Sequence, residues 1–162
     1  MKAILALFLV LCGFLQADEG PHVRPGFDWG AVSLYAIQDR GRLKPFDTFA
    51  RESVQFVTGK AGWKGLQPSE MIFGWLISFD KEWDKEPFIK VGHKPLKKLL
   101  GMNEDTSFFS PAELRANEAL KTHVREISQK QRRGETLNDM DKKILNVQNQ
   151  RLLVEATVSG QT

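Results

Sequence analysis

The chain has 162 residues, of which 41% are hydrophobic, 27% charged and 10% aromatic. This length fits one ordinary domain and excludes a barrel enzyme or a complete multi-span transporter, while the hydrophobic fraction excludes wholesale disorder. Lysine and arginine number 23 against 20 aspartates and glutamates, a formal charge of +3. Because this excess is slight, no nucleic-acid partner is expected.

The first residues have the pattern of an export signal. Lys2 supplies a positive start, residues 3–15 are uncharged and apolar, and Ala17 is a small residue before the acidic Asp18. The apolar run over residues 3–15 is shorter than the roughly 20 residues that a helix needs to cross a bilayer. The pattern therefore predicts a signal peptide over residues 1–17. A spanning helix and lipid attachment at Cys12 remain alternatives.

Cleavage after Ala17 would remove the single cysteine, Cys12. The mature chain could then form no disulfide, no cysteine-based zinc site and no covalent haem attachment of the Cys-x-x-Cys-His kind. We therefore expect its stability to come from packing.

Residues 18–30 hold Pro21 and Pro25 without periodicity and predict a flexible lead-in. A short extended segment is expected over 32–38, then an amphipathic helix with Asp47 as N-cap and Gly59 as C-cap. An apolar, buried helix follows over 71–79, then a charged turn over 80–87 and a short extended piece over 88–91.

The rest of the chain predicts helices. A brief helix with a basic outer face is expected over 94–101. Ser110, Pro111 and Glu113 match a capping box that opens a helix to about Gln131. A second long helix runs from about Leu137 to Val158. The short connection makes 111–158 an antiparallel helical hairpin. Overall the sequence predicts a mainly α, single small domain over 31–162, with short extended segments and a C-terminal antiparallel helical hairpin.

The histidines carry little sign of catalysis. His22, His93 and His123 lie far apart in the sequence, so no local metal-binding pair exists, and no metal site is predicted. No nucleophile elbow, zinc-protease helix or phosphate-binding glycine loop occurs. We therefore expect no enzyme and no catalytic residue. His93 lies in a loop, where it is a candidate haem ligand or faces water.

Two groups of cations are candidate binding sites. One surrounds a helix start, where free N–H groups and arginines would suit an anion; its members are Arg40, Arg42, Lys44, Asp47, Thr48 and Arg51. The alternative is that Asp47 caps the helix and pairs with an arginine. The other group would meet an anionic head group, a haem propionate or the acidic face of a partner, and consists of Lys90, His93, Lys94, Lys97 and Lys98.

Residues 37–51, IQDRGRLKPFDTFAR, closely resemble the opening of the extracytoplasmic segment of bacterial cytochrome c biogenesis proteins of the CcsA/ResB type, also called System II. The resemblance continues in short stretches at 71–76, 80–83, 88–91, 99–101 and 109–114. It implies participation in moving haem across the cytoplasmic membrane and joining it to apocytochrome c. The chain lacks the family's multiple spans, its tryptophan-rich loop and its membrane histidines, so the ligation chemistry does not carry over.

The resemblance leads to one main hypothesis. The chain would be a non-catalytic accessory module, periplasmic or extracytoplasmic and associated with the inner membrane. It would dock on membrane cytochrome c synthase components of the CcsA/ResB type, and apocytochrome c is a further possible partner. No resident cofactor is expected. The alternatives are transient haem binding through His93 and a general periplasmic protein-binding scaffold. Whether the chain is a free subunit or a fragment stays open.

Overall fold

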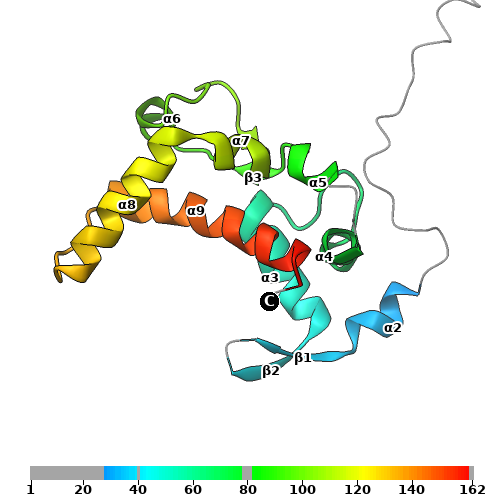
Figure 1. The fold of residues 1–162 in the computed structure, drawn as a ribbon. Coiled ribbons are helices and arrows are strands. Elements are labelled where there is room, and N and C mark those ends of the chain that lie inside the picture. Colours follow the sequence, from blue (N-terminus) through cyan, green and yellow to red (C-terminus); the bar gives the residue numbers. More distant parts are fainter. Residues whose placement is uncertain (1–27, 40, 78–81, 161–162) are drawn as a thin grey trace, which may run out of the picture.

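The computed structural model describes residues 28–39, 41–77 and 82–160, so the predicted signal peptide and most of the predicted lead-in lie outside the described residues. The part of the chain that is described is mainly α-helical, as predicted (Figure 1). Its elements, in chain order, are α2 (Trp29–Ser33), β1 (Ala36–Asp39), β2 (Arg42–Pro45), α3 (Phe46–Thr58), α4 (Pro68–Ile77), α5 (Glu82–Lys85), β3 (Ile89–Lys90), α6 (Lys94–Leu99), β4 (Phe108–Phe109), α7 (Pro111–Ala116), α8 (Glu118–Arg132) and α9 (Asp139–Val158).

The N-terminal arm differs from the prediction. Asp28 accepts a hydrogen bond from the backbone N–H of Ala31 at 3.2 Å and so caps α2. The end of the expected lead-in and the start of the expected extended segment are therefore helical. The extended part begins at Ala36, where β1 pairs antiparallel with β2 through a turn at Gly41, whose φ is +78°. In Figure 1 this hairpin projects from the helical body.

Helix α3 confirms the predicted helix and its end. Gly59 is in the left-handed conformation at φ +67° and donates its N–H to the carbonyl of Gln55. The inner face of α3 is fully buried at Ala50, Val54 and Val57. These three positions are spaced by four and three residues, which is why one stripe of the helix faces the core.

A cluster of aromatic side chains fills the space between α4 and α5. The Trp75 ring stacks on Phe88 with centroids 5.3 Å apart, and Trp83 meets both rings edge to face. A Cβ at Gly74 would lie 2.9 Å from Trp83 Cζ2, so the glycine lets the indole approach the helix. This apolar helix is buried, as predicted, on most of its surface.

Helix α6 lies where a brief helix with a basic outer face was expected. The prediction is wrong for Lys97, which does not lie on the outer face. That side chain is buried, and its ammonium donates to the backbone carbonyls of Glu104 and Thr106, the latter at 2.9 Å. Lys97 therefore holds the loop between α6 and β4 in place.

The predicted helix over 111–131 is two helices. Its capping box at Ser110 and Glu113 is confirmed, but α7 ends at Asn117, which has extended backbone (φ −73°, ψ +106°). The Asn117 side chain accepts from Leu120 N–H at 2.8 Å, which caps α8, and donates to the Leu100 carbonyl at 2.9 Å. An asparagine with partners on both sides makes a corner rather than a continuous helix.

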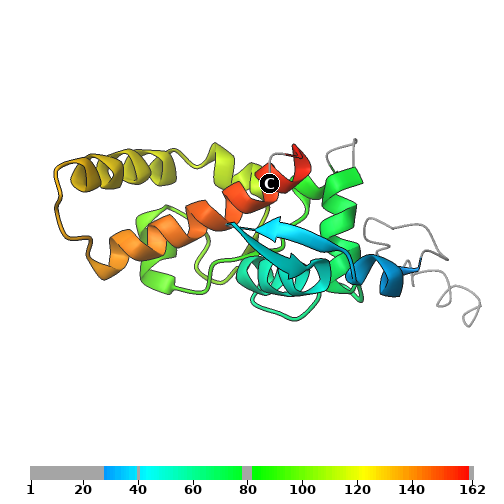
Figure 2. The same ribbon diagram turned by 90° about the horizontal axis from the view of Figure 1, so that it is seen from below.

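The α8 and α9 helices form the predicted antiparallel hairpin; Figure 2 shows them joined by the loop at one end of the molecule. Asn138 and Asp141 make a capping box at the start of α9. Ile144, Val147 and Val154 of α9 are buried, whereas Val158 is 37% exposed. Helix α9 also packs on α3, α4, α6 and α7, and it is the central element of the fold.

Candidate functional site

The β1–β2 hairpin lies at the centre of the stretch predicted to bind a partner. Its register pairs Ala36 with Pro45, Ile37 with Lys44 and Gln38 with Leu43. Because side chains alternate along a strand, one face of the hairpin carries residues 36, 38, 43 and 45, and all four are exposed. The opposite face carries Ile37, Asp39 and Lys44, which are half-buried, and the exposed Arg42 at its edge near the turn. The hairpin thus has an inner face toward α3 and an outer face toward solvent.

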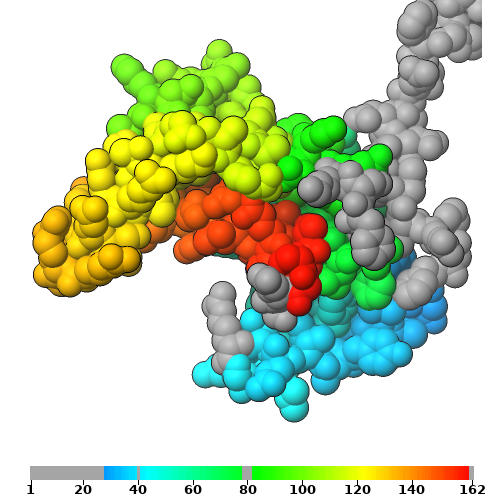
Figure 3. Space-filling view, in the orientation of Figure 1, coloured from blue at the N-terminus to red at the C-terminus, as the bar shows by residue number. Residues whose placement is uncertain are grey.

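The outer face and its approach expose large apolar side chains. Leu43 is 79% exposed, and Leu34 and Tyr35, which lead into β1, are 82% and 67% exposed. These are the most exposed large hydrophobic residues of the described chain. In Figure 3, α2 and the β1–β2 hairpin, in blue and cyan, form the lower edge of the visible face. Large apolar side chains that stay this exposed are candidates for contact with another molecule.

Lys44, a predicted partner-binding cation, already has partners within the chain. Its ammonium lies 2.7 Å from Asp39 Oδ2 and 2.7 Å from Glu52 Oε2. The hydrogen bond to Asp39, then that to Glu52, raises the pKa of Lys44 above its ordinary value. Lys44 therefore ties the hairpin to α3.

Asp47 is not the N-cap that the sequence predicted. Pro45 occupies that position and provides no side-chain cap. Asp47 lies within the first turn of α3, where a carboxylate interacts favourably with the positive end of the helix dipole. Its Oδ2 accepts a hydrogen bond from Arg51 Nε at 2.6 Å. The same ion pair raises the pKa of Arg51. The alternative drawn from the sequence is that Asp47 caps the helix and pairs with an arginine. The pairing is confirmed, and the capping is wrong.

Of the remaining predicted residues, Arg42 and Thr48 are exposed, and Arg40 lies outside the described residues. Among the described cations of this stretch, Arg42 is the one without an acidic partner in the described chain. The structure thus brings the described members of this set, in β2 and α3, to one end of the molecule. Two of the cations stabilise that end, and Arg42 and the outer face of the hairpin stay available. The missed residue is Leu43, which the alternation with Lys44 along β2 could have revealed.

His93, the candidate haem ligand, caps a helix. Its Nδ1 accepts a hydrogen bond from the Leu96 N–H at 3.2 Å, so in the neutral ring the proton is on Nε2. Ligation of iron through Nε2 would require the proton to move to Nδ1 and the cap to be lost. The hydrogen bond that His93 makes in this structure therefore does not fit the role of a haem ligand.

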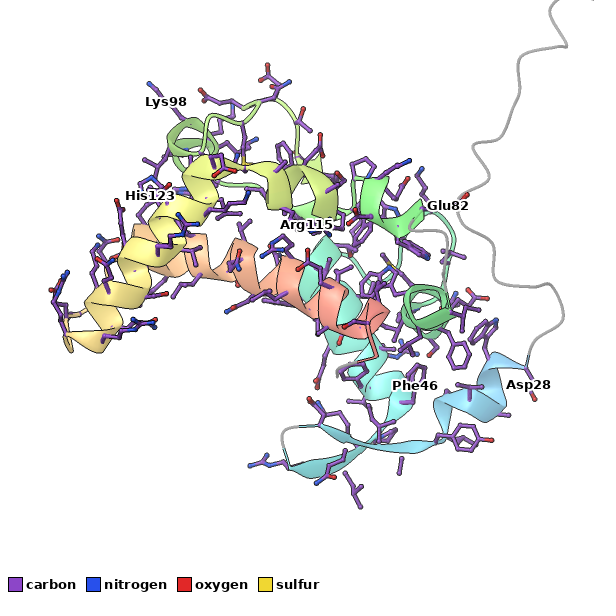
Figure 4. The ribbon with its side chains drawn as sticks, in the orientation of Figure 1. Asp28, Phe46, Glu82, Lys98, Arg115 and His123 are labelled. Carbon is purple, nitrogen blue, oxygen red and sulfur yellow. The ribbon has the colours of Figure 1, made fainter. Side chains whose placement is uncertain are left out.

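Arg115 is the centre of a charge network away from the hairpin. It donates to Asp84 on one side and to Glu155 Oε1 at 2.7 Å on the other, and Arg151 also donates to Glu155. Figure 4 places Arg115 where α7 approaches α9, apart from Phe46 at the base of the hairpin. This network links α5, α7 and α9 and has a structural explanation.

The described residues also bear on a metal site and on a membrane span. They contain no group of three or more histidine, cysteine, aspartate or glutamate side chains placed to hold a metal ion. None of the helices in the described ranges is both long enough and apolar enough to span a bilayer.

Comparison with known proteins gives one informative similarity. No family model matches the chain. The chain is similar to Protein NrfI of Wolinella succinogenes, with 30% identity over 74 residues that make up 46% of this chain and 8% of NrfI. The chain therefore spans less than a tenth of the length of this relative.

Proposed function

We propose that this chain is a non-catalytic accessory module of cytochrome c assembly outside the cytoplasm. It docks on membrane cytochrome c synthase components through the outer face of the β1–β2 hairpin. The single observation that carries the proposal is the exposure of Leu43 on this face and of Leu34 and Tyr35 just before β1, in and next to the stretch whose motif resembles System II proteins. The similarity to NrfI supports the assignment to cytochrome c assembly.

The geometry of the hairpin suits docking. The inner face is fixed to α3 by Lys44 and Glu52, so the outer face is presented on a supported element. Burial of a leucine of this exposure in an interface would contribute about 1.5 to 3 kcal/mol. An exposed arginine such as Arg42 adds a donor for carboxylates at the rim. The hairpin therefore combines an apolar centre with a polar edge, as protein interfaces do.

Co-purification tests the proposal. A tagged chain is expected to retain the membrane synthase when membranes are solubilised and purified. Leu43→Asp is expected to reduce this retention at least about tenfold, because it places a charge where apolar contact is needed. Leu152→Asp is the control, since Leu152 is 44% exposed and belongs to α9 rather than to the hairpin.

Two results would contradict the proposal. One is equal retention of the synthase by the wild-type chain and Leu43→Asp. The other is a normal level of c-type cytochromes in a strain that lacks the chain. Circular dichroism of both variants checks that their helical content is unchanged.

A further inference from the structure

A second surface lies in a groove on the helical body. The groove has a volume of about 420 Å³ and lies between the loop after β3, the start of α6 and the first turns of α9. It is lined mainly by Lys90, Val91, His93, Lys142, Lys143 and Val147. The elements meet there although residues 90–93 and 142–147 are about fifty positions apart in the sequence.

The groove is cationic. Lys90 and Lys143 have no acidic partner among the described residues. Asp139 is the acidic residue of the lining, and its carboxylate contacts Lys142 at 3.4 Å while remaining 92% exposed. An exposed pair of this kind is weak. The lining thus holds three lysines and one aspartate, and the groove has a net positive charge.

Two of the donors are held in place. A Cβ at Gly59 would lie 2.5 Å from Lys90 Cδ and 3.0 Å from its Nζ, so the Lys90 side chain packs against the end of α3. His93 is oriented by the hydrogen bond from Leu96 N–H to its Nδ1, which leaves Nε2–H as a donor. Oriented donors lose less conformational freedom on binding than free side chains do.

The wall of the groove also includes apolar side chains. Val91, Leu96 and Val147 line it and are each no more than 3% exposed. A concave site with an apolar base and cations around it fits a chain that offers carboxylates and small apolar side chains in turn. A flat bilayer surface matches the cations but not the concave shape.

We propose that this groove binds an acidic segment of a partner polypeptide, with carboxylate side chains on Lys90, Lys142 and Lys143. The inference rests on the proposed function only in that the occupant is a protein. It adds a second contact that is electrostatic, whereas the contact at the hairpin is mainly apolar.

The test uses the purified chain and a defined probe. The probe is a pentapeptide in which glutamate and valine alternate, and the reference peptide has glutamine in place of glutamate. Binding is followed by amide chemical shifts in NMR at about 0.15 M salt, where the Debye length of about 8 Å suppresses distant charge effects. The expected result is saturable shifts at Gly92, His93 and Asn146 with the acidic peptide alone.

A pair of variants localises the site. Lys90→Gln together with Lys143→Gln is expected to raise the Kd about tenfold, since it removes two charge contacts. Lys94→Gln together with Lys98→Gln removes the same charge from exposed positions that do not line the groove, and a change below about twofold is expected. The unperturbed amide signals of both variants report on folding.

Three outcomes would overturn the inference: no binding of the acidic peptide, equal binding of the glutamine peptide, or equal weakening by both double variants. A parallel arm measures sedimentation with vesicles that contain phosphatidylglycerol. Vesicle binding lost in the groove variant, without peptide binding, would assign the groove to a lipid head group instead. The peptide titration contains no synthase. A negative titration therefore does not affect the co-purification result, and a negative co-purification does not affect the titration.

Discussion

The hairpin and the groove are both rich in cations in the sequence, yet the structure treats their charges differently. At the hairpin, Lys44 and Arg51 are paired with acids of the same chain, and the exposed surface is apolar. At the groove, Lys90 and Lys143 stay without an acidic partner in the described chain, and the apolar residues form the base. The difference shows that a cluster of cations in the sequence indicates a binding site only where those cations form no ion pairs within the chain.

Lys97 next to the groove gives the largest expected effect. Lys97→Met keeps the buried stem but removes the donor to the carbonyls of Glu104 and Thr106. Hydrogen bonds from a charged donor contribute about 1.5 to 3 kcal/mol, so the free energy of unfolding should fall by about 2 kcal/mol in urea. Lys98→Met is the control on the exposed side, with an expected change within about 0.5 kcal/mol. Equal losses would show that burial does not distinguish the two lysines.

Asp141 offers a pH-dependent test at the start of α9. The hydrogen bond from Lys130 holds the pKa of Asp141 below its ordinary value. Its charged form therefore stabilises the fold above the unfolded value of about 3.9, and this contribution is lost as pH falls through the lower folded value. Asp141→Asn should be less stable than wild type at pH 7, and the gap should close as the solution is acidified toward pH 2. A gap that does not change with pH would contradict this assignment.

A smaller effect is expected at the hairpin. Lys44→Met removes the links to Asp39 and Glu52 and should lower the urea midpoint less than Lys97→Met does. Because these groups are partly solvated, the loss should shrink at about 1 M salt, where the Debye length is about 3 Å. Arg42→Met, which breaks no ion pair of the described chain, serves as the reference. If salt leaves the loss unchanged, the role of Lys44 is packing rather than charge.

The smallest expected effect is spectroscopic. Haem titrated into wild type and His93→Ala should give the same Soret band, because Nδ1 of His93 is engaged as the cap of α6. A shifted band that is lost in His93→Ala would support transient haem binding and would remove His93 from the description of the groove as a fixed donor.

Local signals predicted much of the fold, and long-range contacts account for what they missed. The C-cap at Gly59 and the capping box at Ser110 were readable because their partners lie within four residues. The corner at Asn117 was not, since it depends on a hydrogen bond to Leu100, seventeen residues away. The burial of Lys97 likewise depends on the return of the chain through residues 104–106.

At the candidate site, too, local sequence signals were predictive and long-range contacts were missed. The motif identified the stretch that became the hairpin, but it did not show that Lys44 is bound to Glu52 or that Asp47 lies inside the helix. The groove could not be predicted, because its two walls come from distant segments. The basic cluster around His93 supplied only one of them.

The position of α9 has a consequence for biosynthesis. Gln150 donates to the carbonyl of Phe56, ninety-four residues earlier, and Val147 and Val154 complete the core around α3, α4 and α7. A nascent polypeptide that ends before residue 139 lacks the helix that covers these surfaces. Its apolar residues stay uncovered until translation has passed that point. This body of the molecule thus matures only after α9 has been synthesised.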